Sequence, residues 1–121
     1  MNEASRLDRG AIETLEGMAM SGVPDLLRTI VSMFLDTIQV HLETLKQSAA
    51  SNNPEPIRRV SHDLKSSSAV LGAVALAARC DELETLARSG TTRGAVELVR
   101  HIANEFGAVR PELEALLATP A

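Results

Sequence analysis

Residues 60–84 read VSHDLKSSSAVLGAVALAARCDELE, and the apolar spacing in this stretch indicates a helical fold. Apolar side chains recur at helical intervals on both sides of Gly72, which indicates two amphipathic helices joined by a tight turn. The inward stripe of the first helix is Ile57, Val60, Leu64, Ser68 and Leu71. The inward stripe of the second is Leu76, Cys80, Leu83 and Ala87.

The helical pattern continues on both sides of this hairpin, between breaks at residues 22–24, 51–54 and 89–92. We predict helices over about 8–18, 24–50, 54–71 and 74–88, and a last helix from about 92. Pro24 suits a first helical position and Asn53 suits an N-cap. Pro111 clashes with the carbonyl four residues earlier and predicts a kink or break in the last helix. The inward residues of the other helices are Leu7, Ile12 and Leu15, then Leu27, Ile30, Val31, Phe34, Ile38, Leu42, Leu45 and Ala49, and finally Val96, Val99, Ile102, Ala103, Phe106, Val109 and Leu113.

Four substantial helices with short connections predict an all-α, antiparallel, up-and-down four-helix bundle. The short additional N-terminal helix would cap one end. We expect a single domain over residues 1–121, with its core motif at 60–84.

Composition agrees with this fold class and excludes several functions. The 121 residues are 45% apolar and 23% charged, with two Phe and no Tyr or Trp, which disfavours a strand-rich fold. A net charge of −4 argues against nonspecific nucleic-acid binding. The longest mostly apolar run, residues 69–78, is too short to span a bilayer, and the polar N-terminus does not resemble a signal peptide. We expect a cytoplasmic protein without membrane insertion.

His62 stands out because it points away from the inward stripe of its helix. An exposed imidazole is a usable nucleophile near neutral pH, and nearby cations favour its neutral form and stabilise an attached phosphoryl group. Small side chains beside it leave room for a partner protein. The neighbours on this outer face are Arg58, Arg59, Lys65, Ser66 and Ala69.

Other candidate residues have simpler interpretations. Cys80 lies on a core stripe and is expected to be a buried small hydrophobe, and one cysteine cannot form an internal disulfide. His41 and His101 lack a comparable setting and are expected to be ordinary surface or boundary residues. The serines of residues 66–68 have no paired base. The carboxylates are expected to be scattered over helix surfaces, and no cluster has metal-ligand spacing.

The run from His62 to Ser68, followed by Leu71-Gly72-Ala73 and then by Leu76, Cys80, Leu83 and Glu84, resembles the histidine phosphotransfer (HPt) domain family. That family has approximately H-x-L-K-G-S-S, then L-G-A, then L-x3-C-x2-L-E. The spacing is intact. Ser66 stands where the family usually has Gly, and Val70 stands where it often has a polar residue.

The resemblance implies a four-helix bundle that accepts a phosphoryl group on His62, through Nε2, and passes it between receiver-domain aspartates. Lys65 would contact the phosphoryl group, while Arg58, Arg59, Ser66 and Ala69 would lie where a receiver docks. The implied partners are response-regulator receivers, a hybrid sensor histidine kinase, or both. Such a carrier is usually monomeric and needs no cofactor of its own, because the receiver supplies Mg²⁺ and the acid chemistry.

Two alternatives stay open at this point. The chain could be a non-catalytic helical interaction module that keeps the bundle but no longer transfers phosphoryl groups, and Ser66 is the feature that leans this way. A kinase dimerisation domain also has a phosphoacceptor histidine, but it needs a following ATP-binding domain, and the motif around His62 is of the HPt type.

Overall fold

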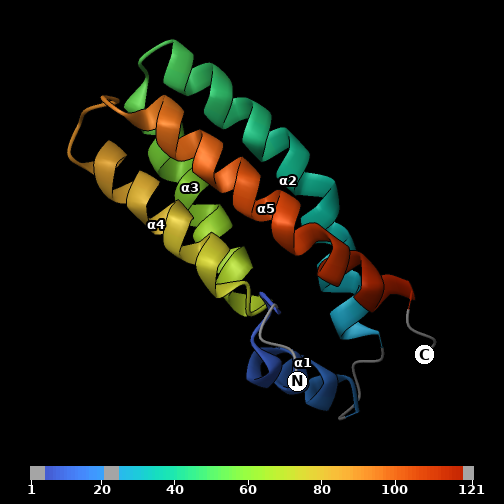
Figure 1. Ribbon diagram of the computed structural model, residues 1–121. Helices are drawn as coiled ribbons and strands as arrows, with labels where there is room; N and C mark the ends of the chain where they lie inside the picture. Colours follow the sequence, from blue (N-terminus) through green and yellow to red (C-terminus); the bar gives the residue numbers. More distant parts are fainter. Residues whose placement is uncertain (1–4, 21–24, 119–121) are drawn as a thin grey trace.

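A computed structural model describes residues 5–20 and 25–118 and contains five α-helices in that part of the chain. Four of them lie side by side and alternate in direction around a shared core, and the first lies at the end of the bundle (Figure 1). No strand occurs among the described residues, so the predicted all-α bundle with a short N-terminal helix is confirmed. The helices are α1 (Arg9–Met20), α2 (Leu26–Ala50), α3 (Pro54–Val70), α4 (Val74–Arg88) and α5 (Ala95–Ala118).

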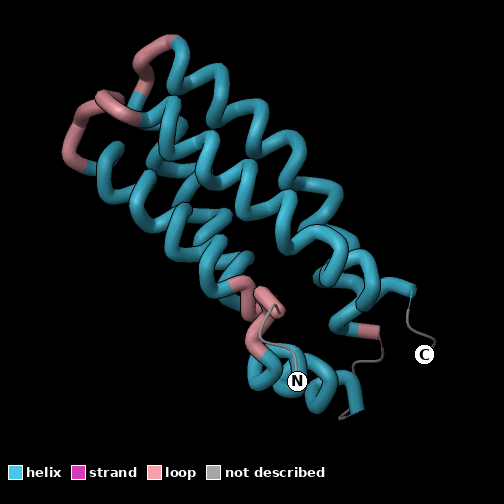
Figure 2. Tube along the Cα trace, viewed as in Figure 1, coloured by secondary structure: helices cyan, strands magenta, loops and turns pink. Residues whose placement is uncertain are grey.

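Connections between the bundle helices are short, as the tube in Figure 2 shows. The bounds of α3 and α4 agree with the prediction to within one residue. Asn53 occupies the N-cap position of α3, but its side chain makes no capping hydrogen bond, so the predicted role is only positional. The predicted break at residues 22–24, including Pro24, lies outside the described residues. No helix in the described ranges is both long and apolar enough to cross a membrane.

The last helix corrects three predictions. It begins at Ala95 rather than near Thr92, because Gly94 adopts a φ of +88°, which lies outside the right-handed helical range. Val96 is 64% exposed and does not face the core. α5 also runs unbroken through Pro111. Both Pro111 and Gly107 lie on the exposed face, where water can bind the carbonyl that loses its partner.

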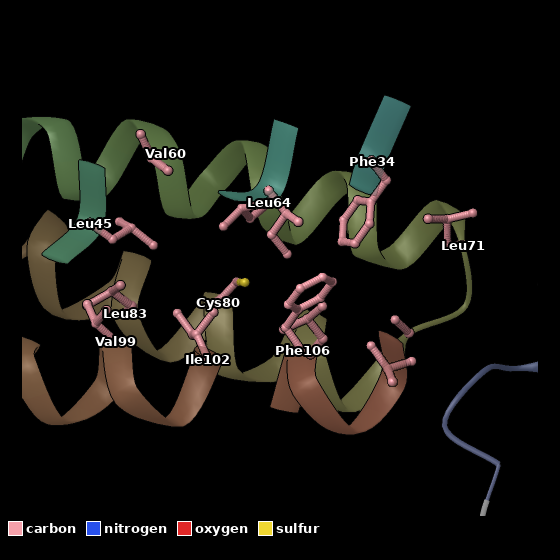
Figure 3. Packing of buried hydrophobic residues seen from close by; sticks show 14 of the residues in the cluster. Phe34, Leu45, Val60, Leu64, Leu71, Cys80, Leu83, Val99, Ile102 and Phe106 are labelled. Carbon is pink, nitrogen blue, oxygen red and sulfur yellow. The ribbon is translucent and has the colours of Figure 1, made fainter. Parts of the chain in front are cut away.

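The core lies along the axis of the bundle and receives side chains from all four long helices (Figure 3). The Phe34 and Phe106 rings meet there, tilted with centroids 6.2 Å apart, and so join α2 to α5. Cys80 is fully buried as predicted, and burial raises the pKa of its thiol to about 12. The predicted inward stripes of α3 and α4 are all buried.

Helices α3 and α4 make the most extensive contact of any pair, and Gly72 forms the turn between them. This glycine has a φ of +74°, and its carbonyl accepts a 2.7 Å hydrogen bond from the backbone N–H of Asp8. A Cβ at residue 72 would lie 2.9 Å from the backbone N and O of Asp8. Glycine is therefore required both for the turn and for the close approach of the segment that leads into α1.

The same N-terminal segment is held on its other side by α5. The Ser5 hydroxyl and the Arg6 backbone N–H each donate a 2.7 Å hydrogen bond to the carboxylate of Glu112. The Arg6 guanidinium lies 2.9 Å from Glu105. These contacts fix α1 across one end of the bundle, as predicted.

Candidate functional site

His62 lies on the outer face of α3, opposite the stripe that packs into the core. Its side chain is 52% exposed, whereas Val60 and Leu64 beside it are buried. The prediction that this imidazole points outward is confirmed. The buried side of α3 thus fixes the position of the helix, and the imidazole on its other side stays accessible.

Glu84 of the neighbouring helix α4 contacts the imidazole. Its side chain is only 2% exposed, and its Oε2 lies 2.9 Å from Nδ1 of His62. An ionised carboxylate can only accept hydrogen bonds, so Nδ1 carries the hydrogen in this contact. Whenever the ring is neutral, Nε2 is therefore the nitrogen without a proton, in a side chain that is 52% exposed.

Two cations also contact the Glu84 carboxylate. The Nζ atom of Lys65 lies 2.7 Å from Oε1, and the guanidinium of Arg88 contacts Oε2. The Lys65 ammonium, together with His62, lowers the pKa of Glu84 even though burial acts in the opposite direction. Glu84 is therefore a buried anion that links His62, Lys65 and Arg88 through one carboxylate.

Lys65 also has a second carboxylate partner, Asp81, whose Oδ1 lies 3.2 Å from Nζ. The two acidic residues raise the pKa of Lys65, Glu84 more than Asp81. Asp81 is 59% exposed, unlike Glu84. The Lys65 ammonium thus lies between a buried and a solvent-exposed carboxylate, close to the imidazole.

The other predicted site residues near His62 differ in their exposure and in their ion-pair partners. Ser66 and Ala69 are exposed and present small side chains. Arg58 is partly buried and forms a 2.7 Å ion pair with Glu55 on the same helix. Arg59 is exposed and has no ion-pair partner in the described part of the chain.

Glu84, Asp81 and Arg88 were not among the predicted site residues. The expectation that the carboxylates are scattered over helix surfaces is wrong for Glu84. A signal was present in the sequence, because Glu84 follows Cys80 by four residues and so shares its inward face. A carboxylate at a buried position requires a partner, and His62 and Lys65 are the nearby candidates.

An apolar groove of about 320 Å³ lies between α2 and α3. Met33 and Val70, which are 61% and 49% exposed, lie in its walls. Ser67 places this groove on the part of α3 that follows the predicted docking residue Ser66. The other apolar residues that line it are Ile30, Phe34 and Leu71.

Comparison with known proteins agrees with this geometry. The family model of the Hpt domain matches residues 29–119, and the chain therefore belongs to the Hpt domain family. It is a histidine phosphotransfer domain, a carrier of phosphoryl groups in two-component phosphorelays, in which Hpt domains interact with receiver domains and kinases.

The fold is similar to that of histidine-containing phosphotransfer protein B (HptB) from Pseudomonas aeruginosa PAO1. The TM-score is 0.83 at 24% sequence identity, over 96% of this chain and 97% of that one. This likeness concerns the fold. A search of curated proteins found no match. None of these comparisons favours the non-catalytic module over phosphotransfer.

Proposed function

We propose that His62 is the phosphoacceptor of this domain and that Nε2 is the atom that receives the phosphoryl group. The observation that carries the proposal is the 2.9 Å contact between Nδ1 and Glu84 Oε2, which orients a half-exposed ring. With its proton held at Nδ1, the imidazole presents the Nε2 lone pair to an incoming protein.

The transfer step follows from this arrangement. The Nε2 lone pair attacks the phosphorus of a receiver's aspartyl phosphate, the N–P bond forms, and the aspartate O–P bond breaks. The receiver's carboxylate leaves with that bond's electron pair, and the imidazole gains a positive charge. Glu84 stabilises this charge through Nδ1–H, and no proton has to move. Lys65 offers an ammonium to the phosphoryl oxygens.

Receiver docking would cover the outer face of α3. Ser66 and Ala69 allow close approach, and Arg59 supplies an exposed positive charge for the acidic pocket of a receiver. Arg58 takes a smaller part because Glu55 neutralises it. The apolar groove with Met33 and Val70 extends this face toward α2 and suits apolar side chains of the partner.

The receiver would supply Mg²⁺ and the residues that neutralise the transferring group, so the carrier itself needs no cofactor. We also propose that residues 1–121 act as one domain, as a monomer and in the cytoplasm, and that a hybrid sensor kinase stands upstream.

Incubation with radiolabelled phosphorylated receiver domains tests the assignment. We expect label on this chain that is stable to base and lost in acid. This behaviour is typical of phosphohistidine and distinguishes it from phosphoserine. Peptide mapping should place it on His62. Label at His41, at His101 or on a serine would overturn the assignment.

A further inference from the structure

Lys65 contacts two carboxylates, Glu84 and Asp81, which differ in burial and in the number of their partners. Glu84 is 2% exposed and contacts two cations, Lys65 and Arg88, as well as the imidazole of His62, so it cannot turn away without leaving a buried charge unpaired. Asp81 is 59% exposed, and Lys65 is its one ion-pair partner among the residues described. Asp81 can therefore release Lys65 to water-filled space at little cost.

The position of Lys65 makes this release relevant to His62. His62 and Lys65 lie three residues apart on α3 and contact the two oxygens of the same Glu84 carboxylate on the neighbouring helix α4, so Nζ lies near the imidazole. Helices α3 and α4 run side by side in Figure 1. A phosphoryl group on Nε2 would add up to two negative charges within reach of that ammonium. Asp81 Oδ1, at 3.2 Å from Nζ, would then compete with the phosphoryl oxygens for one cation.

We propose that Asp81 is a positioning residue that holds the Lys65 ammonium toward α4 and thereby limits how strongly Lys65 stabilises phosphorylated His62. This inference rests on the proposed function of His62 and Lys65. Asp81 lowers the lifetime of the phosphohistidine and favours onward transfer, because it withholds part of the cationic stabilisation that the carrier could give.

The neighbouring residue provides a matched control. Glu82 is 50% exposed, lies next to Asp81 on α4, and pairs with Arg79 rather than with Lys65. Asp81→Asn and Glu82→Gln each remove one exposed negative charge from the same turn of the helix. A difference between them therefore reports the contact with Lys65 and not the overall charge.

The experiment measures the equilibrium of phosphoryl transfer between a radiolabelled receiver and the full chain, and the half-life of the isolated phosphorylated chain. We expect Asp81→Asn to shift the equilibrium toward phosphohistidine, and to lengthen its half-life, by about two- to fivefold, the range set by an exposed ion pair. Glu82→Gln should change neither quantity. In a Lys65→Ala background, the effect of Asp81→Asn should disappear.

The outcomes separate this inference from the proposed function. If wild-type chain is labelled on His62 but Asp81→Asn matches Glu82→Gln, or keeps its effect without Lys65, the role of Asp81 is wrong and His62 stands. If the label is not on His62, both proposals are wrong.

Discussion

His62 of α3 and Glu84 of α4 are 22 positions apart in the sequence, yet Nδ1 of one lies 2.9 Å from Oε2 of the other. The exposed member of the pair is held in a fixed direction by the buried member. An imidazole on a helix surface would otherwise rotate among its rotamers and present either nitrogen to a partner. The Glu84 carboxylate fixes which nitrogen is free.

Replacement of the proposed phosphoacceptor should abolish labelling without unfolding the protein. His62→Gln removes the nucleophile, but a 52% exposed side chain contributes little to the core, so the free energy of unfolding should change by about 1 kcal/mol or less. Denaturant unfolding and receiver-dependent labelling measure the two effects. His41→Gln and His101→Gln serve as controls and should be labelled like the wild type.

Neutralisation of Glu84 should slow transfer and destabilise the fold. In Glu84→Gln, Lys65 and Arg88 lose their counter-charge, and the loss should cost about 1–2 kcal/mol, less than for a fully buried pair because both cations are partly exposed. Transfer slows because the positive imidazole formed in the reaction is no longer neutralised. A Glu84→Gln protein with wild-type transfer rates would contradict the role given to this carboxylate.

The same carboxylate predicts a pH dependence. The pKa of Glu84 is lower in the folded protein than its ordinary value of 4.5, mainly because of Lys65. Its contribution to stability is therefore complete above pH 4.5 and is lost as the pH falls through the lowered folded-state pKa. The stability difference between wild type and Glu84→Gln should therefore shrink as the pH falls through this acid range, as measured by urea unfolding at a series of pH values.

The three basic residues near His62 should differ in their effects. Lys65→Ala should slow the transfer step itself at saturating receiver. Arg59→Ala should instead weaken receiver association and reduce its salt dependence, because Arg59 is an exposed charge. Arg58→Ala should have the smallest effect, since Glu55 already neutralises Arg58. Rapid-mixing transfer assays at two ionic strengths distinguish these cases. If all three substitutions had equal, negligible effects, the proposal that charge guides receiver docking would be wrong.

Ser66 tests how closely the receiver approaches α3. Ser66→Leu should leave the melting temperature nearly unchanged, since the side chain is exposed, but should block docking by steric overlap. Ser66→Gly should destabilise the helix by up to about 1 kcal/mol and leave transfer intact or faster. Ala108→Leu, an exposed change on α5, is the control for added bulk. Normal transfer through Ser66→Leu would show that the partner does not close over this face.

Substitution of Gly72 by Ala should cost more stability than the same substitution at another glycine of positive φ. Gly72→Ala combines backbone strain with a 2.9 Å clash against Asp8 and should cost about 3 kcal/mol. Gly90→Ala, at φ +88° with open space around it, should cost only about 1 kcal/mol. Equal losses in chemical unfolding of the two variants would mean that the contact between Asp8 and the turn contributes nothing.

Helical periodicity alone predicts the helices, the inward stripes apart from Val96, and the outward position of His62. These features are local, because helical periodicity relates residues three and four apart whatever the rest of the chain does. The stripe through Val60 and Leu64 therefore predicted which side of α3 is buried, and the opposite side had to contain the imidazole. Where local conformation departed from periodicity, as at Gly94 and Val96, the sequence pattern alone placed the start of α5 incorrectly.

The groups that lie against the imidazole depend on how the helices pack together. The meeting of His62 with Glu84, and of Lys65 with both Glu84 and Asp81, depends on the register of α3 against α4. That register is set by the turn at Gly72 and by the packing of two buried stripes, and a shift of one residue on α4 would rotate Glu84 by about 100° away from His62. Periodicity along one helix contains no information about the register between two, so the chemistry of His62 is fixed by packing.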